Sequence, residues 1–432
     1  MKYVSQVFGG ILFLLVLAGW GFSQDTLSLS DCVRIALERN PELASEQESY
    51  LSERAGFLDS WSGLLPDASL SGGYSHFSKE SMRISGSGFE SSDESYSTSF
   101  SASWNIFRGG SDVLGLLSER SSVSLARLSY HSKIRNIISN VKRGYLDILR
   151  YQALLVLADS SLVRARAERE FIEEKNRLGA ASELELAQAR VEEKSRELSL
   201  IQARNNLSSS KEHLNFLLGI PADTVYTVVL DTSLDIKPPP LEECIQIALD
   251  SSCEYRSALI SEQIARRNYL ATFSSFLPGV NLNYSYSWNG SSPPGGIKEI
   301  KDEGYSSVGL SVSLPVFEGL SRLSRTASAR HRYLEARWRT LNTRASVEES
   351  VRSIYRRIQE TDASLSLSRM KLEEASHSLQ LAWEMYRLGS ISYIELVTSE
   401  LDFVQSKSEL IESRYNYLVA VSELELYTGK LY

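Results

Sequence analysis

The sequence has little of what enzymes use for chemistry. Its 432 residues include only five histidines, three cysteines and four methionines, and the histidines are scattered without the spacing of a metal site. It contains neither a phosphate loop of the GxxxxGK[ST] type nor a GxSxG nucleophile turn. We therefore expect no catalytic residues, no metal and no cofactor, and we predict that the protein is not an enzyme.

The chain also lacks positive charge in excess and, beyond its N-terminus, long apolar runs. Its formal net charge is −8, which does not suggest a nucleic-acid partner. Residues 8–20 form an apolar stretch between Lys2 and the small residues Gly21 and Ser23, which is the pattern of a secretory signal peptide. We predict a signal peptide over residues 1–23. A membrane anchor is the alternative, but the apolar stretch is short for a span.

The three cysteines are Cys32, Cys244 and Cys253. Cys32 and Cys244 each precede an apolar helical face, at Ile35 and Ile247 respectively. We interpret these two as small buried core residues, with a disulfide as the alternative.

The main feature that the sequence does have is a long heptad pattern. Between about residues 321 and 387, apolar side chains recur every seven positions without an interrupting proline, at Val351, Ile358, Leu365, Leu372, Leu379 and Tyr386. This pattern predicts a coiled coil, because the apolar stripe must keep facing a partner helix. At about 1.5 Å per residue the helix would be roughly 100 Å long. It should end at Leu388-Gly389, where glycine permits the backbone to reverse.

The same pattern occurs earlier in the chain. Val141, Ile148, Leu155 and Leu162 each precede their counterpart by 210 residues, and Leu178-Gly179 precedes Leu388-Gly389 by the same distance. The chain is therefore a duplication. We predict repeat 1 over residues 24–220, a linker over 221–240 and repeat 2 over 241–432, with coiled-coil helices at about 111–218 and 321–428.

Each repeat also contains two segments with a period of two. Apolar or aromatic residues alternate with Ser, Asn and Gly over about 67–77, 96–107, 279–289 and 305–317. Each segment is near the ~9–11 residues that a tilted strand needs to cross a bilayer. The polar face is almost uncharged, which favours an outer-membrane barrel over a soluble sheet. We expect the polar stretches 79–95 and 290–304 to be outer loops.

The apolar face of these strands supplies the side chains that we expect to face lipid. They are Phe100, Trp104, Tyr284, Tyr286, Trp288 and Leu310. Four strands cannot close a barrel, and an open edge in lipid would leave backbone groups unpaired. We therefore expect several copies of the chain to assemble.

The ordered set of motifs resembles the TolC-like outer membrane efflux protein family. Twice between Leu27 and Gly429 the predicted order is short helix, helix, hairpin, long helix and return helix. Local motifs support the resemblance: Asn40-Pro41, the Leu-Pro pairs at 65–66 and 277–278, the segments 104–110 and 314–319, and the Arg-Leu-Gly turns at 177–179 and 387–389. The resemblance implies a mainly α fold with a small membrane β part. Three protomers would form a 12-stranded β-barrel and a periplasmic α-barrel.

The resemblance also implies a function and a location. The protein would be an outer-membrane duct of a Gram-negative-type bacterium that extends into the periplasm. As part of a tripartite efflux or type I secretion system, it would passively export small molecules or proteins. An inner-membrane pump would deliver this cargo through a periplasmic adaptor. A membrane-anchored coiled-coil scaffold or adhesin without transport is the alternative, although helices that fold back at glycine disfavour it.

The resemblance assigns roles to residues around the two turns. The adaptor contacts would be Arg177, Leu178, Gly179, Arg387, Leu388 and Gly389. Glu185 and Glu395 follow each turn by six residues and would ring the pore aperture, where like charges attract cations. The alternative for these two is an ordinary solvated glutamate on a helix.

Overall fold

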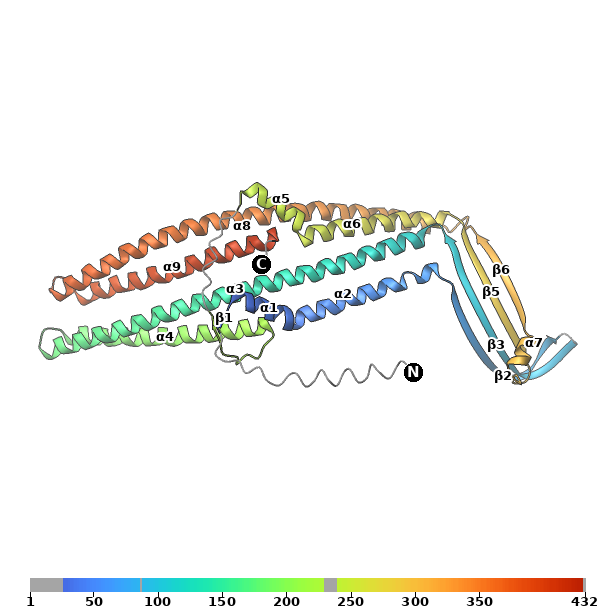
Figure 1. Cartoon of the computed structure of the whole chain (residues 1–432), viewed down its shortest axis with the longest axis horizontal. Coiled ribbons are helices and arrows are strands. Elements are labelled where there is room, and N and C mark those ends of the chain that lie inside the picture. The colour runs from blue at the N-terminus through green and yellow to red at the C-terminus, as the bar shows by residue number, and fades with distance from the viewer. Residues whose placement is uncertain (1–25, 86–87, 229–238, 430–432) are drawn as a thin grey trace. The chain divides into compact units, whose positions relative to one another are not determined.

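The computed structural model of the chain describes residues 26–85, 88–228 and 239–429 (Figure 1). The expected signal peptide and half of the expected linker, residues 229–238, lie outside the described residues. The chain divides into two compact units. The first draws on Met1–Leu43, Ile134–Cys244 and Val351–Tyr432, and the second on Ala44–Lys133 and Ile245–Ser350. Each copy of the sequence repeat therefore contributes residues to both units.

Two antiparallel helical hairpins build the first unit. Helix α3 (Ser111–Arg177) turns back into α4 (Glu183–Leu218), and α8 (Ser321–Arg387) turns back into α9 (Tyr393–Thr428). The parts of α3 and α8 that precede residues 134 and 351 belong to the second unit. The heptad positions form the core, with Val141, Ile148 and Val351 fully buried. The coiled-coil prediction is thus confirmed, and α8 spans the predicted residues.

Short elements close the end of α4. Helix α1 (Leu29–Arg39) precedes α2 (Pro41–Asp59), and the Asn40 side chain between them donates a 2.9 Å hydrogen bond to the Leu217 carbonyl. Strand β1 (Thr26–Leu27) pairs in parallel with β4 (Thr227–Val228), which lies within the stretch expected to be a linker. Helix α5 (Leu241–Ser251) follows that linker. Cys32 of α1 and Cys244 of α5 are buried, which confirms their interpretation as core residues.

The second unit contains a four-stranded antiparallel sheet in the order β2-β3-β5-β6. The strands are β2 (Asp67–Ser85), β3 (Gly88–Arg108), β5 (Gly279–Gly290) and β6 (Tyr305–Ser313). Because β3 pairs with β5, the hairpins of the two repeats join into one sheet.

The strand ends differ from the sequence expectation. Strands β2 and β3 continue through most of 79–95, which the sequence predicted to be a loop, because backbone pairing such as Ser81 with Ser92 does not require alternating side chains. Strand β6 ends before Pro315, which has no N–H to donate to a ladder. The loop 290–304 holds the short helix α7 (Ile297–Glu303).

Helices support this sheet within the second unit. Helix α2 contacts the first part of α3 through Tyr50 and Tyr130, and α6 (Cys253–Ala271) contacts α8 through Tyr269 and Tyr333; both ring pairs stack with centroids 6.4 Å apart. The 3-10 turns η2 (Ser62–Leu64) and η3 (Thr272–Phe276) lead from these helices into β2 and β5. No helix in the described part of the chain combines the length and apolar character that a membrane span requires.

We expect Gly219→Ala to destabilise the protein more than Gly179→Ala. Both glycines have positive φ, at +69° and +75°, so each substitution carries the left-handed cost of about 1–2 kcal/mol. Only at Gly219 would the new Cβ also lie 2.6 Å from the Arg39 carbonyl oxygen, whereas Gly179 has open space around it. Thermal unfolding of the two variants measures the difference. Equal losses would contradict the close packing at the end of α4.

Candidate functional site

The two helical hairpins of the first unit end in matching turns. Gly179 has φ +75° and its N–H donates to the Asn176 carbonyl, while Ala180 N–H donates to Lys175 at 2.8 Å. Gly389, with φ +73°, and Ser390 repeat these bonds after α8. This pair of bonds satisfies the last carbonyls of each long helix. The sequence-predicted turns therefore exist at both positions.

The predicted contact residues at these turns project into solvent. Leu178 is 71% exposed and Leu388 is 81% exposed, although both are large apolar side chains. Arg177 is exposed and pairs with Glu174, one turn earlier on the same helix. A pair of exposed leucines at a turn is a candidate contact surface for another protein.

Glu185 and Glu395 lie directly after the turns and have a structural role that the sequence reasoning missed. The Ser182 hydroxyl accepts a bond from the Glu185 N–H, and the Glu185 carboxylate accepts one from the Ser182 N–H at 2.9 Å. Ser392 and Glu395 repeat this capping box at the start of α9. The backbone N–H of Ser392 lowers the pKa of the Glu395 carboxyl. The S-x-x-E spacing in the sequence was a signal for both boxes.

All four long helices meet in an apolar core beside the turns. Helix α3 contributes Ile172, α4 contributes Leu186 and Ala189, and the second hairpin contributes Leu379, Ala382, Tyr386, Tyr393 and Leu396. The residues come from both repeats. The two turns therefore lie at the same end of the first unit.

Next to this core the two hairpins bury charged groups. Glu168 of α3 and Glu400 of α9 are 2% and 1% exposed. The Arg164 Nε lies 3.3 Å from one oxygen of Glu400. On α4, Arg196 Nε lies 2.6 Å from Glu192 Oε1. These residues were not predicted from the sequence to form a site. A signal was available for Glu168, which continues the buried stripe of Ser161 and Ala165 at helical spacing.

Further ion pairs connect α3 to α9 along their length. Lys142 Nζ lies 2.7 Å from Glu425 Oε2, and both side chains are largely buried. Arg150 pairs with Glu412 at 3.1 Å and lies over the Tyr415 ring. In these pairs the basic residue belongs to the first repeat and the acidic residue to the second, so they favour packing of one hairpin against the other.

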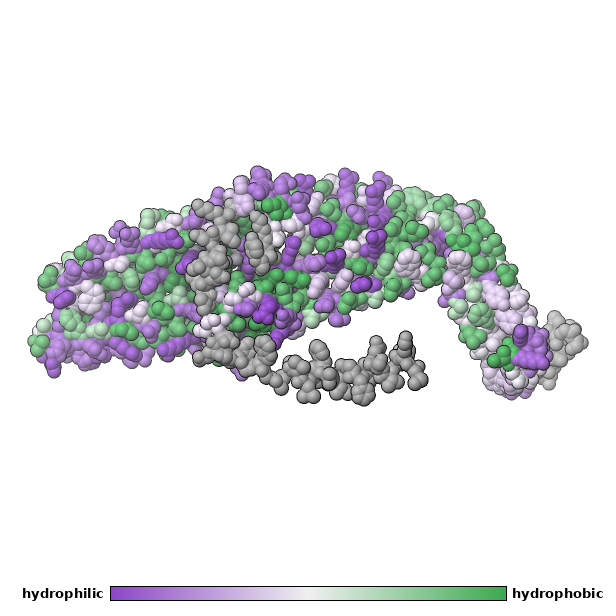
Figure 2. Space-filling view, viewed as in Figure 1, coloured by the Kyte–Doolittle hydropathy of each residue, from purple (hydrophilic) through white to green (hydrophobic). Residues whose placement is uncertain are grey.

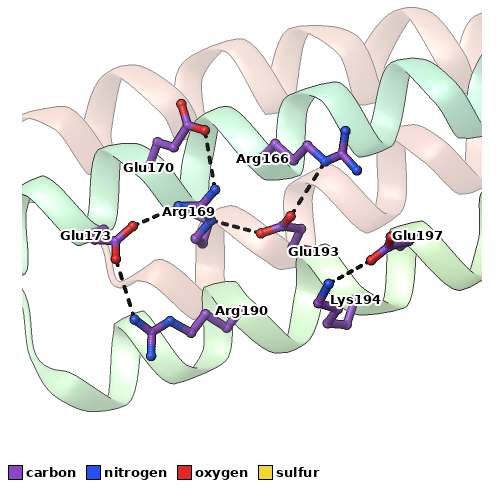
Figure 3. Close-up of polar contacts among 8 residues, drawn as sticks. All are labelled: Arg166, Arg169, Glu170, Glu173, Arg190, Glu193, Lys194 and Glu197. Atoms are coloured by element: carbon purple, nitrogen blue, oxygen red, sulfur yellow. Dashed lines mark hydrogen bonds and ion pairs between the residues drawn. The ribbon is translucent and has the colours of Figure 1, made fainter.

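A separate ion network joins α3 to α4 within the first hairpin (Figure 3). Arg169 lies between two carboxylates, with Nε 2.8 Å from Glu193 and Nη1 2.7 Å from Glu173. Arg190 of α4 reaches Glu173 at 3.5 Å. Exposed ion pairs contribute about 0–1 kcal/mol each, so this network adds modestly to the coiled coil.

The sheet of the second unit has two chemically different faces. Side chains on one face are mostly serine and asparagine, and they bond across the strands: Ser69 to Ser101, Ser71 to Ser99, Ser285 to Ser307, and Asn281 to Asn105. The opposite face is aromatic and aliphatic, and its residues pair across strands as Phe100 with Tyr286 and Leu282 with both Trp104 and Leu310. Five of the six residues predicted to face lipid are partly or largely exposed on this face: Phe100, Trp104, Tyr284, Tyr286 and Leu310.

Trp288 differs from the other residues of that set. It is 2% exposed, and its ring lies so close to Gly290 that a Cβ there would be 2.6 Å from ring carbons. After β5 the chain folds back, and the Tyr286 hydroxyl donates to the carbonyls of Ile300 and Lys301 at α7. Because the Trp288 side chain is buried within the chain itself, it is removed from the residues expected to face lipid.

Exposed apolar side chains also gather where the helices of the second unit meet its strands (Figure 2). These residues were not predicted from the sequence to form an interface. We call them the junction collar: Trp61, Phe107, Phe273, Phe276, Val316 and Phe317. Val316 is 90% exposed, which is unusual for a solvent-facing valine beside other apolar groups.

Comparisons with known proteins agree with this architecture. The family model for the outer membrane efflux protein matches residues 32–220 and 244–430. The chain is 22% identical over 434 residues to the outer membrane protein TolC of Escherichia coli, covering 98% of this chain and 86% of TolC. It is 22% identical to the alkaline protease secretion protein AprF of Pseudomonas aeruginosa, covering 100% of this chain and 89% of AprF.

A solved structure gives the same result for the fold. A crystal structure of CusC superposes with a TM-score of 0.82 at 19% identity, covering 95% of this chain and 94% of that chain.

We expect Ser392→Ala to lower the free energy of unfolding by about 0.5–2 kcal/mol, because it removes the side-chain acceptor of the α9 capping box. Ser399→Ala is the matched control, since the Ser399 hydroxyl bonds only to the Glu395 carbonyl of its own helix. Denaturant unfolding of both variants measures the loss. The capping role would be wrong if the control lost as much stability as Ser392→Ala.

Proposed function

The chain belongs to the outer membrane efflux protein family, and on that premise we propose how it works as the outer-membrane duct of a tripartite efflux or secretion system. It is an outer-membrane channel whose helices extend into the periplasm. One structural observation carries the proposal. The sheet of the second unit has an aromatic face suited to lipid and a serine and asparagine face suited to a water-filled lumen.

The open edges of this sheet support assembly into a trimer. Strands β2 and β6 each have one neighbour among the described strands, so one side of each presents unpaired backbone groups. Unpaired backbone is costly in lipid, and only a closed barrel avoids it. If β6 of one protomer pairs with β2 of the next, three copies form a barrel of 12 strands. The junction collar would then lie at the membrane interface, where aromatic side chains are enriched.

The duct would be passive. Its relatives are channels rather than enzymes, so energy and choice of cargo would come from an inner-membrane pump. The relatives' names include protein secretion and cation efflux. Either cargo class is compatible with a lumen lined by small uncharged side chains.

The hairpin turns would contact the periplasmic adaptor. Leu178 and Leu388 are exposed beside Gly179 and Gly389, whose lack of a side chain lets a partner approach the backbone. Arg177 and Arg387 flank them and would pair with acidic groups on the adaptor. The two turns present the same chemistry, so an adaptor assembly could bind both repeats in the same way.

Glu185 and Glu395 would line the pore aperture beyond the turns. In a trimer they would supply six carboxylates near one opening, and a ring of like charges favours cations. The capping boxes fix where these carboxylates lie, because each is bonded to the backbone at the start of its helix. The structural and electrostatic roles are therefore compatible at the same residues.

We expect Glu185→Gln/Glu395→Gln to reduce cation preference while the fold stays stable, because glutamine keeps the capping box and removes the charge. Single-channel recording of the purified protein in a planar bilayer, with a salt gradient, measures conductance and selectivity. The Glu185→Ala/Glu395→Ala protein is the comparison, since it loses both roles. Conductance without any change in selectivity would exclude the aperture role. A folded oligomer that never conducts would oppose the duct itself.

We expect Leu178→Ser/Leu388→Ser to weaken adaptor binding at least tenfold, a loss of roughly 1.4 kcal/mol or more, and to reduce export accordingly, while trimers still form. Val225→Ser is the control, because Val225 is equally exposed but lies far from the turns in the sequence. Adaptor binding to the purified trimer and export by cells that depend on this duct are the measurements. Wild-type binding by the double variant would place the adaptor contact elsewhere.

A further inference from the structure

The buried carboxyl groups of Glu168 and Glu400 have no role in the proposed duct. They come from different hairpins, since Glu168 belongs to α3 and Glu400 to α9. They also break the symmetry of the duplication, because the positions 210 residues away are Ser378 and Arg190. The pair is therefore not a feature that both repeats need in order to fold.

The surroundings of Glu168 leave its charge uncompensated. Neither of its carboxyl oxygens meets an N–H or hydroxyl donor among the described residues, although the side chain is almost fully buried. The carboxyl of Glu400 lies within reach of it, and the two can share a hydrogen bond when one of them is protonated. One Glu400 oxygen likewise has no donor, while the other faces Arg164.

Every packed helix contributes to the electrostatics of this site. Among the described residues, helix α3 supplies Arg164, the cation that acts on Glu168, and α4 supplies Glu192, whose own partner is Arg196. Helix α8 supplies Tyr386, and α9 supplies Tyr393 beside Glu400. The site thus holds three carboxyl groups, from Glu168, Glu192 and Glu400, and two guanidinium groups, from Arg164 and Arg196. Arg196 already forms an ion pair with Glu192. Two ionised carboxylates would thus share the single cation Arg164.

We propose that Glu168 and Glu400 form a proton-binding site that joins the two helical hairpins. With one proton present, the Glu168 carboxyl donates a hydrogen bond to the Glu400 carboxylate, which also pairs with Arg164. Without that proton, two buried like charges face each other across the junction between α3 and α9. The hairpins are then held less tightly, because unpaired buried charge is costly and like charges repel.

The ionisation behaviour of Glu168 agrees with this geometry. Burial, followed by the neighbouring Glu400 charge, raises the pKa of Glu168 to about 8. In the unfolded chain a glutamate titrates near its ordinary pKa of about 4.3. Between these values the folded protein holds the extra proton, so stability falls as pH rises. The site therefore stabilises the packing of the two hairpins at mildly acidic and neutral pH, and this stabilisation is lost under alkaline conditions.

The consequence for transport rests on the proposed function. If the turns of the two hairpins surround the closed end of a duct, a weaker junction between the hairpins favours the open state. The proton site itself does not depend on this, since it concerns only the stability of the junction. A test on the junction and a test on conductance therefore give separate answers.

The test uses the purified full-length mature protein, with Glu168→Gln as the main variant. Glutamine has nearly the same shape and donates permanently to Glu400, so it mimics the protonated side chain. Infrared spectra recorded between about pH 6 and about pH 9 should show the carbonyl band of a buried carboxylic acid that disappears as the pH rises. The band should be absent in Glu168→Gln. In Glu400→Gln it should disappear at lower pH, because the neighbouring charge has gone.

Thermal unfolding provides the second readout. The wild type should lose several degrees of Tm more than Glu168→Gln across the same pH range, and Glu168→Gln should be the more stable protein at the alkaline end. Glu170→Gln is the matched control, since Glu170 is exposed on the same helix. The proposal would be overturned if the wild type lacked the carboxylic-acid band at neutral pH, or if the control changed the pH dependence as much as Glu168→Gln does. Absence of conductance would count against the duct and leave this result unaffected.

Discussion

Burial of the heptad stripe between two helical hairpins is the constraint on which the first unit depends. A single helix of 67 residues with an apolar stripe is not stable by itself in water, and most of its stability must come from packing. After the glycine turns that end α3 and α8, the chain runs back as α4 and α9, each of 36 residues. These two helices provide part of the surface against which the apolar stripes pack. The two hairpins then bury Val141, Ile148 and Val351 against their neighbours. The position of each turn matters for this burial, because it decides which residues of the long helix lie beside the returning helix.

The sheet is subject to the opposite constraint, since its apolar face has little protein to cover it. Serine pairs such as Ser69 with Ser101 satisfy one another on the polar face, while Leu310 remains largely exposed on the other. In the proposed trimer this face would contact lipid, and copies of the chain would pair their free edges to close the lumen. Membrane insertion and oligomerisation would then be linked by the unpaired backbone of β2 and β6.

Charged groups complete the hairpin junction in two ways. Ion pairs such as Lys142 with Glu425 join α3 to α9 through opposite charges. Glu168 and Glu400 join the same helices through a proton, so their contribution depends on pH. The duplication explains why both kinds can coexist. Both repeats share the apolar heptad stripe, and their sequences can differ at positions where one repeat faces the other.

The sequence by itself determined the duplication, the bounds of the long helices, the glycine turns and the alternation of the strands. These features are local or strictly periodic, so a single pattern along the chain carries them. Only the tertiary structure decided that Trp288 is buried beside Gly290, and that β2 and β3 continue beyond their alternating stretch. It alone paired β3 with β5 and brought Glu168 to Glu400. Each of these depends on contacts between residues that no sequence period connects, and burial decides which of them gain stability.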